Sequence, residues 1–243
     1  MSGMNVLVVG GGGREHALVI GLNESPSVDA IHIAPGNAGT AVLGLNHQVE
    51  AGDVDGLVSL SQHLEVDLVI VGPEGPLVDG LADRLREVGI SCFGPHSAGA
   101  ELEGSKLHAK KIMQELNIPT AGIILIENSE RIKEALDTFS PPWVVKRDVL
   151  AGGKGVVVTE SRKEAYEALS YGLESDGFVL LEEFLSGEEA SVLVIMDESG
   201  YVCLPPSQDH KRVGDGDSGP NTGGMGAYSP APIATAAVMQ RAI

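Results

Sequence analysis

The chain has 243 residues, 43% of them hydrophobic and 21% charged, which is typical of a folded globular protein and excludes a disordered one. Its formal net charge of −18 argues against nucleic acid or an anionic membrane as a partner. It shows no signal peptide or transmembrane stretch and has only two cysteines, Cys92 and Cys203, so we expect a reduced, cytoplasmic protein without disulfide or zinc.

The first hundred residues alternate short apolar runs with amphipathic runs. Predicted strands, rich in branched residues and bounded by Gly or Pro, span residues 5–9, 30–34, 67–71 and 90–93. Predicted helices span residues 14–23, 54–64 and 77–88. This alternation predicts an α/β domain with a doubly wound parallel sheet, which we assign to residues 1–103.

The pattern changes after residue 104. Helices are predicted at 105–117, after Ser161 with Glu164 as a capping box, and at 234–243. Predicted strands span 143–148, 155–160, 178–184, 190–196 and 201–205. Residues 104–243 therefore read as a second, α+β domain.

The glycine-rich stretch VVGGGGREH, residues 8–16, joins the first predicted strand to a helix, so free amides at the helix start would form an anion site. A dinucleotide site is disfavoured because Glu15 or His16 replaces the third glycine and because residues 35–37, Pro-Gly-Asn, replace the acidic residue. Arg14 adds a bidentate partner for phosphate. We interpret the loop as a phosphate-monoester site, with a purely structural turn as the alternative.

Two further loops, APGNAG at 34–39 and VGPEGP at 71–76, also follow predicted parallel strands. Ligands of open sheets bind at the carboxyl ends of such strands. Asn37 and Glu74 could then hydrogen-bond sugar hydroxyls. Each loop alone is more simply a turn, but three such loops from adjacent strands predict one ligand crevice.

The stretch VVKRDVLAGGKGVVV, residues 144–158, is a strand, a glycine-rich loop and a second strand, and it lacks the Walker pattern. Such a hairpin suits a flap over nucleotide phosphates, carrying Lys154, with Lys146 beneath. The alternative is a flexible surface hairpin. In LLEEFLSGEE, residues 180–189, backbone groups could meet an adenine edge and a carboxylate the ribose, although an acidic loop is usually just solvated.

Taken together, these stretches resemble the ATP-grasp ligases, and among them the glycinamide ribonucleotide synthetase (phosphoribosylamine–glycine ligase) family. The resemblance runs from VVGGGGREHAL at 8–18, through LEGSK at 102–106 and EEFLSGEEAS at 182–191, to SQDHKRVGDGDSGPNTGGMGAYSPAP at 207–232. It implies a ligase of purine biosynthesis that joins glycine to 5-phosphoribosylamine. ATP would phosphorylate the glycine carboxylate, and the amine would attack the resulting acyl phosphate.

The resemblance also implies roles for individual residues. The 5-phosphoribosylamine phosphate and sugar would be bound by Gly10, Gly11, Gly12, Gly13, Arg14, Glu15, Asn37, Gly72, Pro73 and Glu74. The forming bond would lie near Pro220, Asn221, Thr222, Gly223, Gly224 and Met225. The ATP phosphates would contact Lys106 and Lys146, and the flap over them would be Gly152, Gly153, Lys154 and Gly155. The adenine would be bound by Glu182, Glu183, Phe184 and Leu185, and the ribose hydroxyls by Glu189. Catalytic roles would fall to Lys146, Lys154, Asp209 and Lys211.

Two departures from the family pattern affect what we expect. The family usually has Lys-Ala-Asp-Gly where residues 146–149 read Lys-Arg-Asp-Val; valine stiffens the approach to the flap and Arg147 adds a charge there, so we expect altered flap behaviour rather than lost ATP binding. Family members also continue further, so we expect an incomplete ATP-grasp domain with a lid subdomain at about 120–188. The Mg²⁺ ligands would lie beyond residue 243.

The chain alone is therefore expected to show little or no ligase activity. Its partners would be the small-molecule substrates, and either a missing C-terminal half or a second copy of itself. A non-catalytic ligand-binding module, or a subunit completed by another chain, is the alternative function. A different ATP-grasp ligase of the purine pathway is a third, which the two longest matching loops disfavour.

Overall fold

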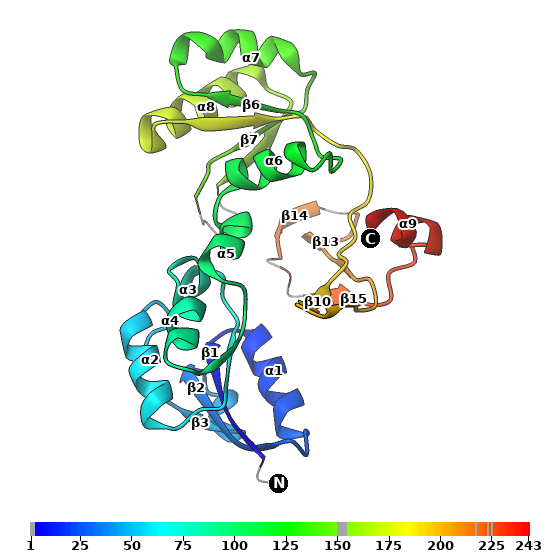
Figure 1. Cartoon of the computed structure of the whole chain (residues 1–243). Helices are drawn as coiled ribbons and strands as arrows, with labels where there is room; N and C mark the ends of the chain where they lie inside the picture. Colours follow the sequence, from blue (N-terminus) through cyan, green and yellow to red (C-terminus); the bar gives the residue numbers. More distant parts are fainter. Residues whose placement is uncertain (1–2, 150–154, 217, 223, 225) are drawn as a thin grey trace.

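The computed structural model describes residues 3–149, 155–216, 218–222, 224 and 226–243 (Figure 1). Within these ranges a five-stranded sheet near the N-terminus precedes a four-stranded sheet, and two-stranded sheets follow. No helix in these ranges is long and apolar enough to cross a membrane. The predicted mixed α/β fold with an N-terminal parallel sheet is confirmed.

The first sheet is parallel throughout and has the strand order β3-β2-β1-β4-β5. Its strands are β1 (Met4–Gly10), β2 (Val28–Pro35), β3 (Leu45–Asn46), β4 (Leu68–Val71) and β5 (Ser91–Phe93). The intervening helices are α1 (Gly13–Asn23), the 3₁₀ turn η1 (Thr40–Val42), α2 (Val54–His63), α3 (Gly75–Val78) and α4 (Leu81–Glu87). This order places β1 at the centre of the sheet.

Helices cover both faces of this sheet. Alternate side chains of β1 point to opposite faces, as the period of two in a strand requires. Leu7 packs in a buried cluster with Leu57 of α2 and Leu85 of α4, whereas Val8 packs with Val19 of α1 on the other face. Burial on both faces explains why residues 6–9 of β1 form an uninterrupted apolar run, and the predicted doubly wound arrangement is present.

Three details of the first hundred residues differ from the sequence-based expectation. The single helix predicted at 77–88 is two helices, because Gly80 between α3 and α4 has a left-handed φ of +85°. The short strand β3 and the helix α5 (Ser97–Gly104) were not predicted. Cys92, in β5, is free and half-buried, and its burial raises the pKa of the thiol to about 11.

The second sheet is antiparallel, with the order β6-β9-β7-β8. Its strands are β6 (Ile123–Ile126), β7 (Trp143–Lys146), β8 (Val156–Thr159) and β9 (Val179–Glu182), and its helices and turn are α6 (Lys106–Glu115), η2 (Ser129–Arg131), α7 (Ile132–Thr138) and α8 (Arg162–Asp176). Leu136 of α7 and Leu169 of α8 pack with Trp143 and Leu181 in one buried cluster, so both helices cover the same face.

Serine residues begin two of these helices. Ser105 separates α5 from α6, and its hydroxyl accepts a hydrogen bond from the His108 amide at 3.0 Å. Ser161 caps α8 as predicted, accepting from the Glu164 amide at 3.3 Å. The reciprocal contact of a capping box differs, because the Glu164 carboxylate accepts from the Thr159 hydroxyl.

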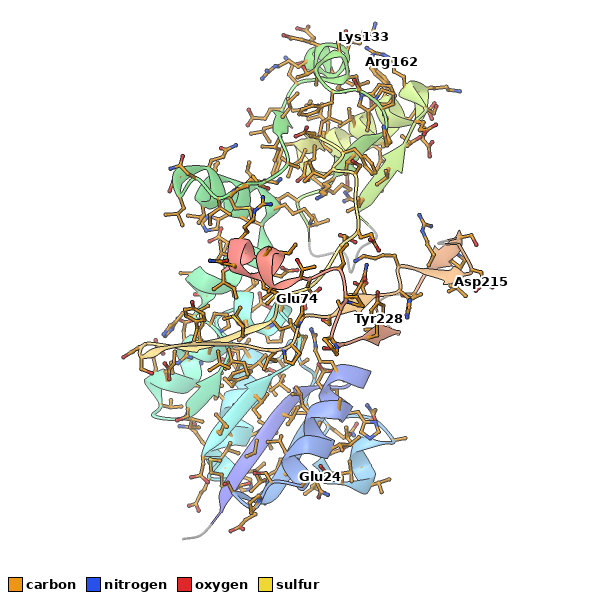
Figure 2. The ribbon with its side chains drawn as sticks, turned by 90° about the vertical axis from the view of Figure 1, so that its right-hand side faces the viewer. Glu24, Glu74, Lys133, Arg162, Asp215 and Tyr228 are labelled. Carbon is orange, nitrogen blue, oxygen red and sulfur yellow. The ribbon has the colours of Figure 1, made fainter. Side chains whose placement is uncertain are left out.

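The last segment of the chain consists of short paired strands and a helix. These are β10 (Val194–Asp197), β11 (Gly200–Cys203), β12 (Gln208–Asp209), β13 (Arg212–Gly214), β14 (Ser218–Asn221), β15 (Ala227–Tyr228) and α9 (Ala236–Ala242). Figures 1 and 2 both show it at the level between the two larger sheets. The strands predicted at 190–196 and 201–205 do pair, as β10 and β11, but their apolar side chains remain largely exposed.

Candidate functional site

The three predicted ligand loops lie together at the carboxyl edge of the first sheet. The strands that they follow, β2, β1 and β4, are adjacent and parallel. The Gly36 amide donates to the Gly10 carbonyl at 3.1 Å, and the Gly72 amide donates to the Val9 carbonyl at 3.0 Å. Along the chain, the strands are added on one side of β1 as far as β3 and on its other side from β4 onward. The switch point between β1 and β4 is where open α/β sheets bind ligands. Figure 2 shows Glu74, from the third loop, at the end of this unit that faces the rest of the chain.

Glu15 occupies the inside of the glycine loop. Its side chain is 5% exposed, its carboxylate accepts from the Gly12 amide at 2.6 Å, and it pairs with Arg14 Nε at 3.1 Å. A Cβ at Gly72 would overlap this carboxylate, and Gly10 has φ +122° beside it, so both positions require glycine. The predicted phosphate loop therefore already holds one internal anion. Among the described contacts, the amides of Gly13 and Arg14 have no acceptor and remain for a ligand.

Asn37 ties the first two loops together. Its side-chain amide nitrogen donates to the Gly11 carbonyl at 3.0 Å, and its side-chain oxygen accepts from the Gly39 and Thr40 amides at 2.7 and 3.0 Å. The predicted contact with a sugar hydroxyl would compete with these bonds. Asn46, which sequence reasoning missed, donates to the Asn37 carbonyl at 2.8 Å. Asn37 in this structure shapes the loops.

A lysine cluster lies under the second sheet, where Lys146 was predicted to meet nucleotide phosphates. Lys146 Nζ lies 2.7 Å from Glu182 Oε2, and Lys110 Nζ lies 3.6 Å from Glu182 Oε1. The Glu182 side chain is 5% exposed, and its carboxylate pairs with both lysines. The contact of residues 182–185 with adenine stays a prediction. Sequence reasoning missed Lys110, because an isolated lysine in an amphipathic helix normally points to solvent.

The segment before the predicted flap is anchored on two sides. The Asp148 carboxylate accepts from the Ser105 hydroxyl at 2.8 Å and from the Lys106 amide, which caps the start of α6. Lys106 Nζ donates to the Val149 carbonyl at 3.1 Å. Lys106, predicted to contact ATP phosphates, therefore lies at the base of the flap. The predicted flap residues Gly152, Gly153 and Lys154 lie outside the described residues.

The expectation that Arg147 adds a charge at the flap is corrected by its contacts. Side chains alternate along the strand and its extension, so Lys146 turns toward Glu182 and Arg147 turns toward α8. Its guanidinium binds both oxygens of Asp176 at 2.6 and 2.7 Å, which neutralises the charge and holds the pKa of the Asp176 carboxyl below its usual value. The Arg147 amide donates to the carbonyl of Gly155, the described end of the flap, at 2.9 Å.

The residues predicted to bind adenine begin inside the sheet and end at the surface. Glu182 is the last residue of β9. The Glu183 carboxylate accepts from the Gly122 amide at 3.0 Å, so it is engaged with the chain. Phe184 and Leu185 are 42% and 63% exposed, which is unusual for large apolar side chains that follow a buried strand. These two residues offer an uncovered apolar surface that a flat ring could contact.

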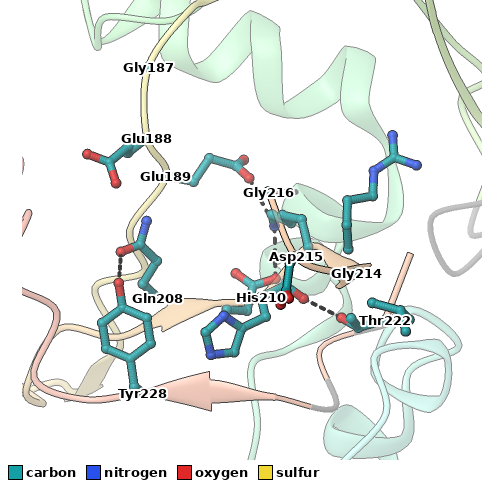
Figure 3. Close-up of a pocket in the computed structure, with 14 residues that line it drawn as sticks. Gly187, Glu188, Glu189, Gln208, His210, Gly214, Asp215, Gly216, Thr222 and Tyr228 are labelled. Atoms are coloured by element: carbon teal, nitrogen blue, oxygen red, sulfur yellow. Dashed lines mark hydrogen bonds and ion pairs between the residues drawn. The ribbon is translucent and has the colours of Figure 1, made fainter. Parts of the chain in front are cut away.

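A separate open cavity of about 860 Å³ lies in the last segment (Figure 3). Lys211 Nζ lies 3.0 Å from Glu189 and 3.1 Å from Asp209. The hydrogen bond to Glu189 is the largest cause that raises the pKa of Lys211; burial opposes it, and the hydrogen bond to Asp209 adds to the increase. The lining is Gly187, Glu188, Glu189, Gln208, Asp209, His210, Lys211, Arg212, Val213, Gly214, Asp215, Gly216, Thr222 and Tyr228. The structure thus brings together Asp209 and Lys211, both predicted as catalytic, with Glu189, predicted for ribose.

Of the predicted residues 220–225, Thr222 lines this cavity. Its hydroxyl donates to the His210 carbonyl, and its amide donates to the Lys211 carbonyl at 3.0 Å. Pro220 and Gly224 are exposed and do not belong to the lining described above, while Gly223 and Met225 lie outside the described residues. Asn221 is the last residue of β14. Within the described contacts, nothing joins this cavity to the lysine cluster.

The lysine cluster has the charge that a nucleotide phosphate needs. Two ammonium groups share one carboxylate, so the cluster carries a net positive charge in a mostly buried position, where attraction for an anion is strongest. The described residues fit a nucleotide phosphate better than they fit a metal ion. Among the described residues, no group of three or more His, Cys, Asp or Glu side chains could hold one, and the location of the Mg²⁺ ligands stays a prediction.

Comparisons with known proteins cover almost the whole chain. The family model described as phosphoribosylglycinamide synthetase, N domain, matches residues 4–103, and the model for the ATP-grasp (A) domain of the same enzyme matches residues 104–243. A phosphoribosylamine–glycine ligase from Mycobacterium leprae is 46% identical over an alignment of 245 positions, which covers 99% of this chain and 58% of that protein. One from Salmonella typhimurium is 47% identical over an alignment of 246 positions, which covers 98% of this chain and 57% of that protein.

Solved structures agree with these matches. The crystal structure of a phosphoribosylamine–glycine ligase from Thermotoga maritima has a TM-score of 0.79 and 35% identity, and the match covers 97% of this chain and 58% of that one. An N5-carboxyaminoimidazole ribonucleotide synthetase from Thermus thermophilus has a TM-score of 0.73 at 22% identity, covering 98% and 62%, and shows the fold alone. The chain spans somewhat more than half the length of the relatives that it matches.

Proposed function

Because the chain belongs to the phosphoribosylglycinamide synthetase family, we propose that it supplies the substrate-binding domain and the first part of the ATP-grasp domain of a ligase. The ligase joins glycine to 5-phosphoribosylamine and hydrolyses ATP to ADP and phosphate, in purine biosynthesis. Residues 1–103 form the substrate domain in this proposal, and residues 104–243 belong to the ATP-grasp domain, with a lid subdomain at about 120–188. The family models that meet at residues 103 and 104 support this division.

The observation that carries the proposal is the lysine cluster. A buried cationic group at the base of a glycine-rich hairpin has little structural purpose, because burying two ammonium groups around one carboxylate is costly. A nucleotide phosphate would complete the charge balance. Lys146 and Lys106 would then neutralise the phosphates, and the exposed Phe184 and Leu185 would contact the adenine.

The reaction needs two anions brought together. A carboxylate oxygen of glycine attacks the terminal phosphorus of ATP and releases ADP, which forms an acyl phosphate. The amine nitrogen of 5-phosphoribosylamine then attacks the acyl carbon, and phosphate and one proton leave. Mg²⁺, when bound, would offset charge on the transferring phosphoryl group.

Two parts of the chain would hold the reactants. The amides of Gly13 and Arg14 at the first sheet would bind the 5-phosphoribosylamine phosphate. The cavity around Lys211 and Asp209 would face the glycine and amine ends. Lysine is cationic at neutral pH, and the carboxylates around Lys211 raise its pKa further, which suits its ammonium to bind a carboxylate or acyl phosphate.

The proposal includes a requirement for further polypeptide. The strands β10 and β11 expose apolar side chains on a two-stranded sheet, and the matched relatives are longer than this chain. The same exposed surface favours the second candidate, a binding subunit that another chain completes. Family membership speaks against a different purine-pathway ligase.

The test begins with ATP binding to the chain, measured by calorimetry. Wild-type protein should bind ATP, and Lys146→Met should weaken binding about 10- to 100-fold, since a charge-assisted contact is lost. Lys133→Met, on the exposed side of α7, is the matched control and should have no effect. A wild-type chain that binds no ATP would contradict the proposal.

Ligase activity is then measured as glycine-dependent phosphate release with 5-phosphoribosylamine and MgATP. The chain alone should release little phosphate. Adding the remaining portion of the Salmonella relative as a separate polypeptide should restore release, and the Lys146→Met chain should not support it. Clear activity of the chain alone would show that the requirement for further polypeptide is wrong, and restored binding without turnover would favour the binding subunit.

A further inference from the structure

Lys110 is buried in a way that its sequence does not explain. Its side chain is 10% exposed, although α6 is otherwise an exposed or half-buried helix. Its ammonium donates to the Thr120 hydroxyl at 2.8 Å and to the Ala121 carbonyl at 3.0 Å, and lies 3.6 Å from Glu182 Oε1. Lysine is almost never buried to this degree without partners. The three contacts join α6, the approach to β6, and β9.

Glu182 connects Lys110 to Lys146. Val144 of β7 lies directly opposite Glu182 of β9 in the strand register, so Lys146, two residues further, is its diagonal neighbour on the same face. One carboxylate oxygen lies 2.7 Å from Lys146, and the other faces Lys110. That second oxygen is buried and has no hydrogen bond among the described residues. The Lys110 charge is therefore what balances it.

We propose that Lys110, acting through Glu182, is a positioning residue that fixes the Lys146 ammonium for a nucleotide phosphate. The nucleotide as ligand is taken from the proposed function. The coupling of Lys110 to Lys146 through Glu182 rests on the geometry alone. Without the Lys110 charge, Glu182 would have a single cationic partner, and both of its oxygens would compete for Lys146. The cluster would also lose its net positive charge. Both changes reduce the attraction of Lys146 for phosphate.

The first experiment compares ATP with adenosine as probes, by calorimetry on the full chain. Lys110→Met should weaken ATP binding roughly 5- to 50-fold, within the usual range of coupling between residues in contact, and leave adenosine binding unchanged. Lys110→Arg keeps the charge and should recover part of the ATP affinity. Lys111→Met, the exposed neighbour on α6, is the control and should bind ATP normally. Equal losses for both probes would indicate a purely structural role and overturn the inference.

The second experiment needs no nucleotide. The free energies of unfolding of Lys110→Met, Lys146→Met and the double variant are measured by urea denaturation. Each single variant leaves Glu182 one cation, whereas the double variant leaves a buried carboxylate with none, so it should lose more stability than the two single losses combined. Additive losses would overturn the coupling. A wild-type chain that fails to bind ATP would count against the proposed function. The three stability measurements form a double-mutant cycle, which tests the coupling between Lys110 and Lys146 independently of ATP.

Discussion

Arg147 shows how a single side chain can add stability without adding charge to a binding site. Its guanidinium binds the Asp176 carboxylate through two nitrogens, its Nη2 donates to the Ser175 hydroxyl at 3.0 Å, and it lies 5.4 Å from the centre of the Tyr171 ring. These partners all belong to α8. The residue that departs from the family pattern therefore fixes one end of the predicted flap to the helix behind it.

Arg147→Ala, which restores the residue usual in the family, should lower the melting temperature at pH 7. ATP affinity should change little, because the guanidinium is turned away from Lys146. Arg162→Ala is the matched control: its pair with Asp137 is between exposed side chains, and such pairs contribute little. A large loss of ATP affinity with unchanged melting temperature would contradict this account.

The same variant should show a defined pH dependence. Arg147 holds the pKa of Asp176 below its usual value of 3.8, so the stabilisation is complete above that value and is lost as pH falls through the lower folded-state pKa. The difference in melting temperature between wild type and Arg147→Ala should therefore be constant from pH 5 to 7 and shrink below about pH 3.8. A difference that persists at pH 2 would mean that the ion pair is not its source.

At the scale of helices and strands, α8 packs against several strands of the second sheet and forms much of its core. Leu169 is completely buried, and it packs in the same cluster as Trp143, whose indole donates to the Leu136 and Phe139 carbonyls at 3.1 and 3.0 Å. Trp143 is the one tryptophan in the sequence. Its fluorescence therefore reports the unfolding of this unit and not of the first sheet.

Leu169→Ala should lower the free energy of unfolding of this unit by about 2–5 kcal/mol, because it leaves a cavity in a close-packed core. The measurement is urea denaturation followed by Trp143 fluorescence. Leu116→Ala, just after α6, removes the same atoms from a side chain that is 66% exposed and should cost less than about 0.5 kcal/mol. Similar losses for the two variants would show that α8 does not hold this core together.

The sequence predicts those elements best whose pattern reflects burial. Residues 6–9 of β1 are all apolar because helices cover both faces of the sheet, and the Ser161 cap marks the start of α8. The short strand β3 and the helix α5 carry no such signal, and Gly80 interrupts a pattern that is periodic on both sides of it. The site follows the same rule. Loops at strand ends could be predicted from chain order. Asn46 and Lys110 matter through side-chain contacts with other loops and strands, which a pattern along the chain does not show.

For the whole molecule, the notable surface is the hairpin of β10 and β11. Met196, Tyr201 and Val202 are 71%, 61% and 64% exposed, and Ile195 lies directly opposite Val202. Both faces of the hairpin therefore present apolar side chains, and its outer edges have unpaired backbone groups among the described residues. Contiguous surfaces of this kind mark an interface, and open strand edges favour pairing with another chain.

The chain should therefore self-associate as its concentration rises, and Val202→Lys should reduce that association. A charge placed on the hairpin would have to be desolvated in any contact made through it. Sedimentation velocity over a range of concentrations measures the effect.

Val42→Lys is the matched control, because Val42 is 82% exposed but lies in η1, away from the hairpin. If both variants reduced association equally, net charge would be the cause, and a wild-type chain that stayed monomeric throughout would show that the hairpin alone does not drive assembly. The remaining portion of the Salmonella relative should also suppress self-association, because we expect it to cover the same strands.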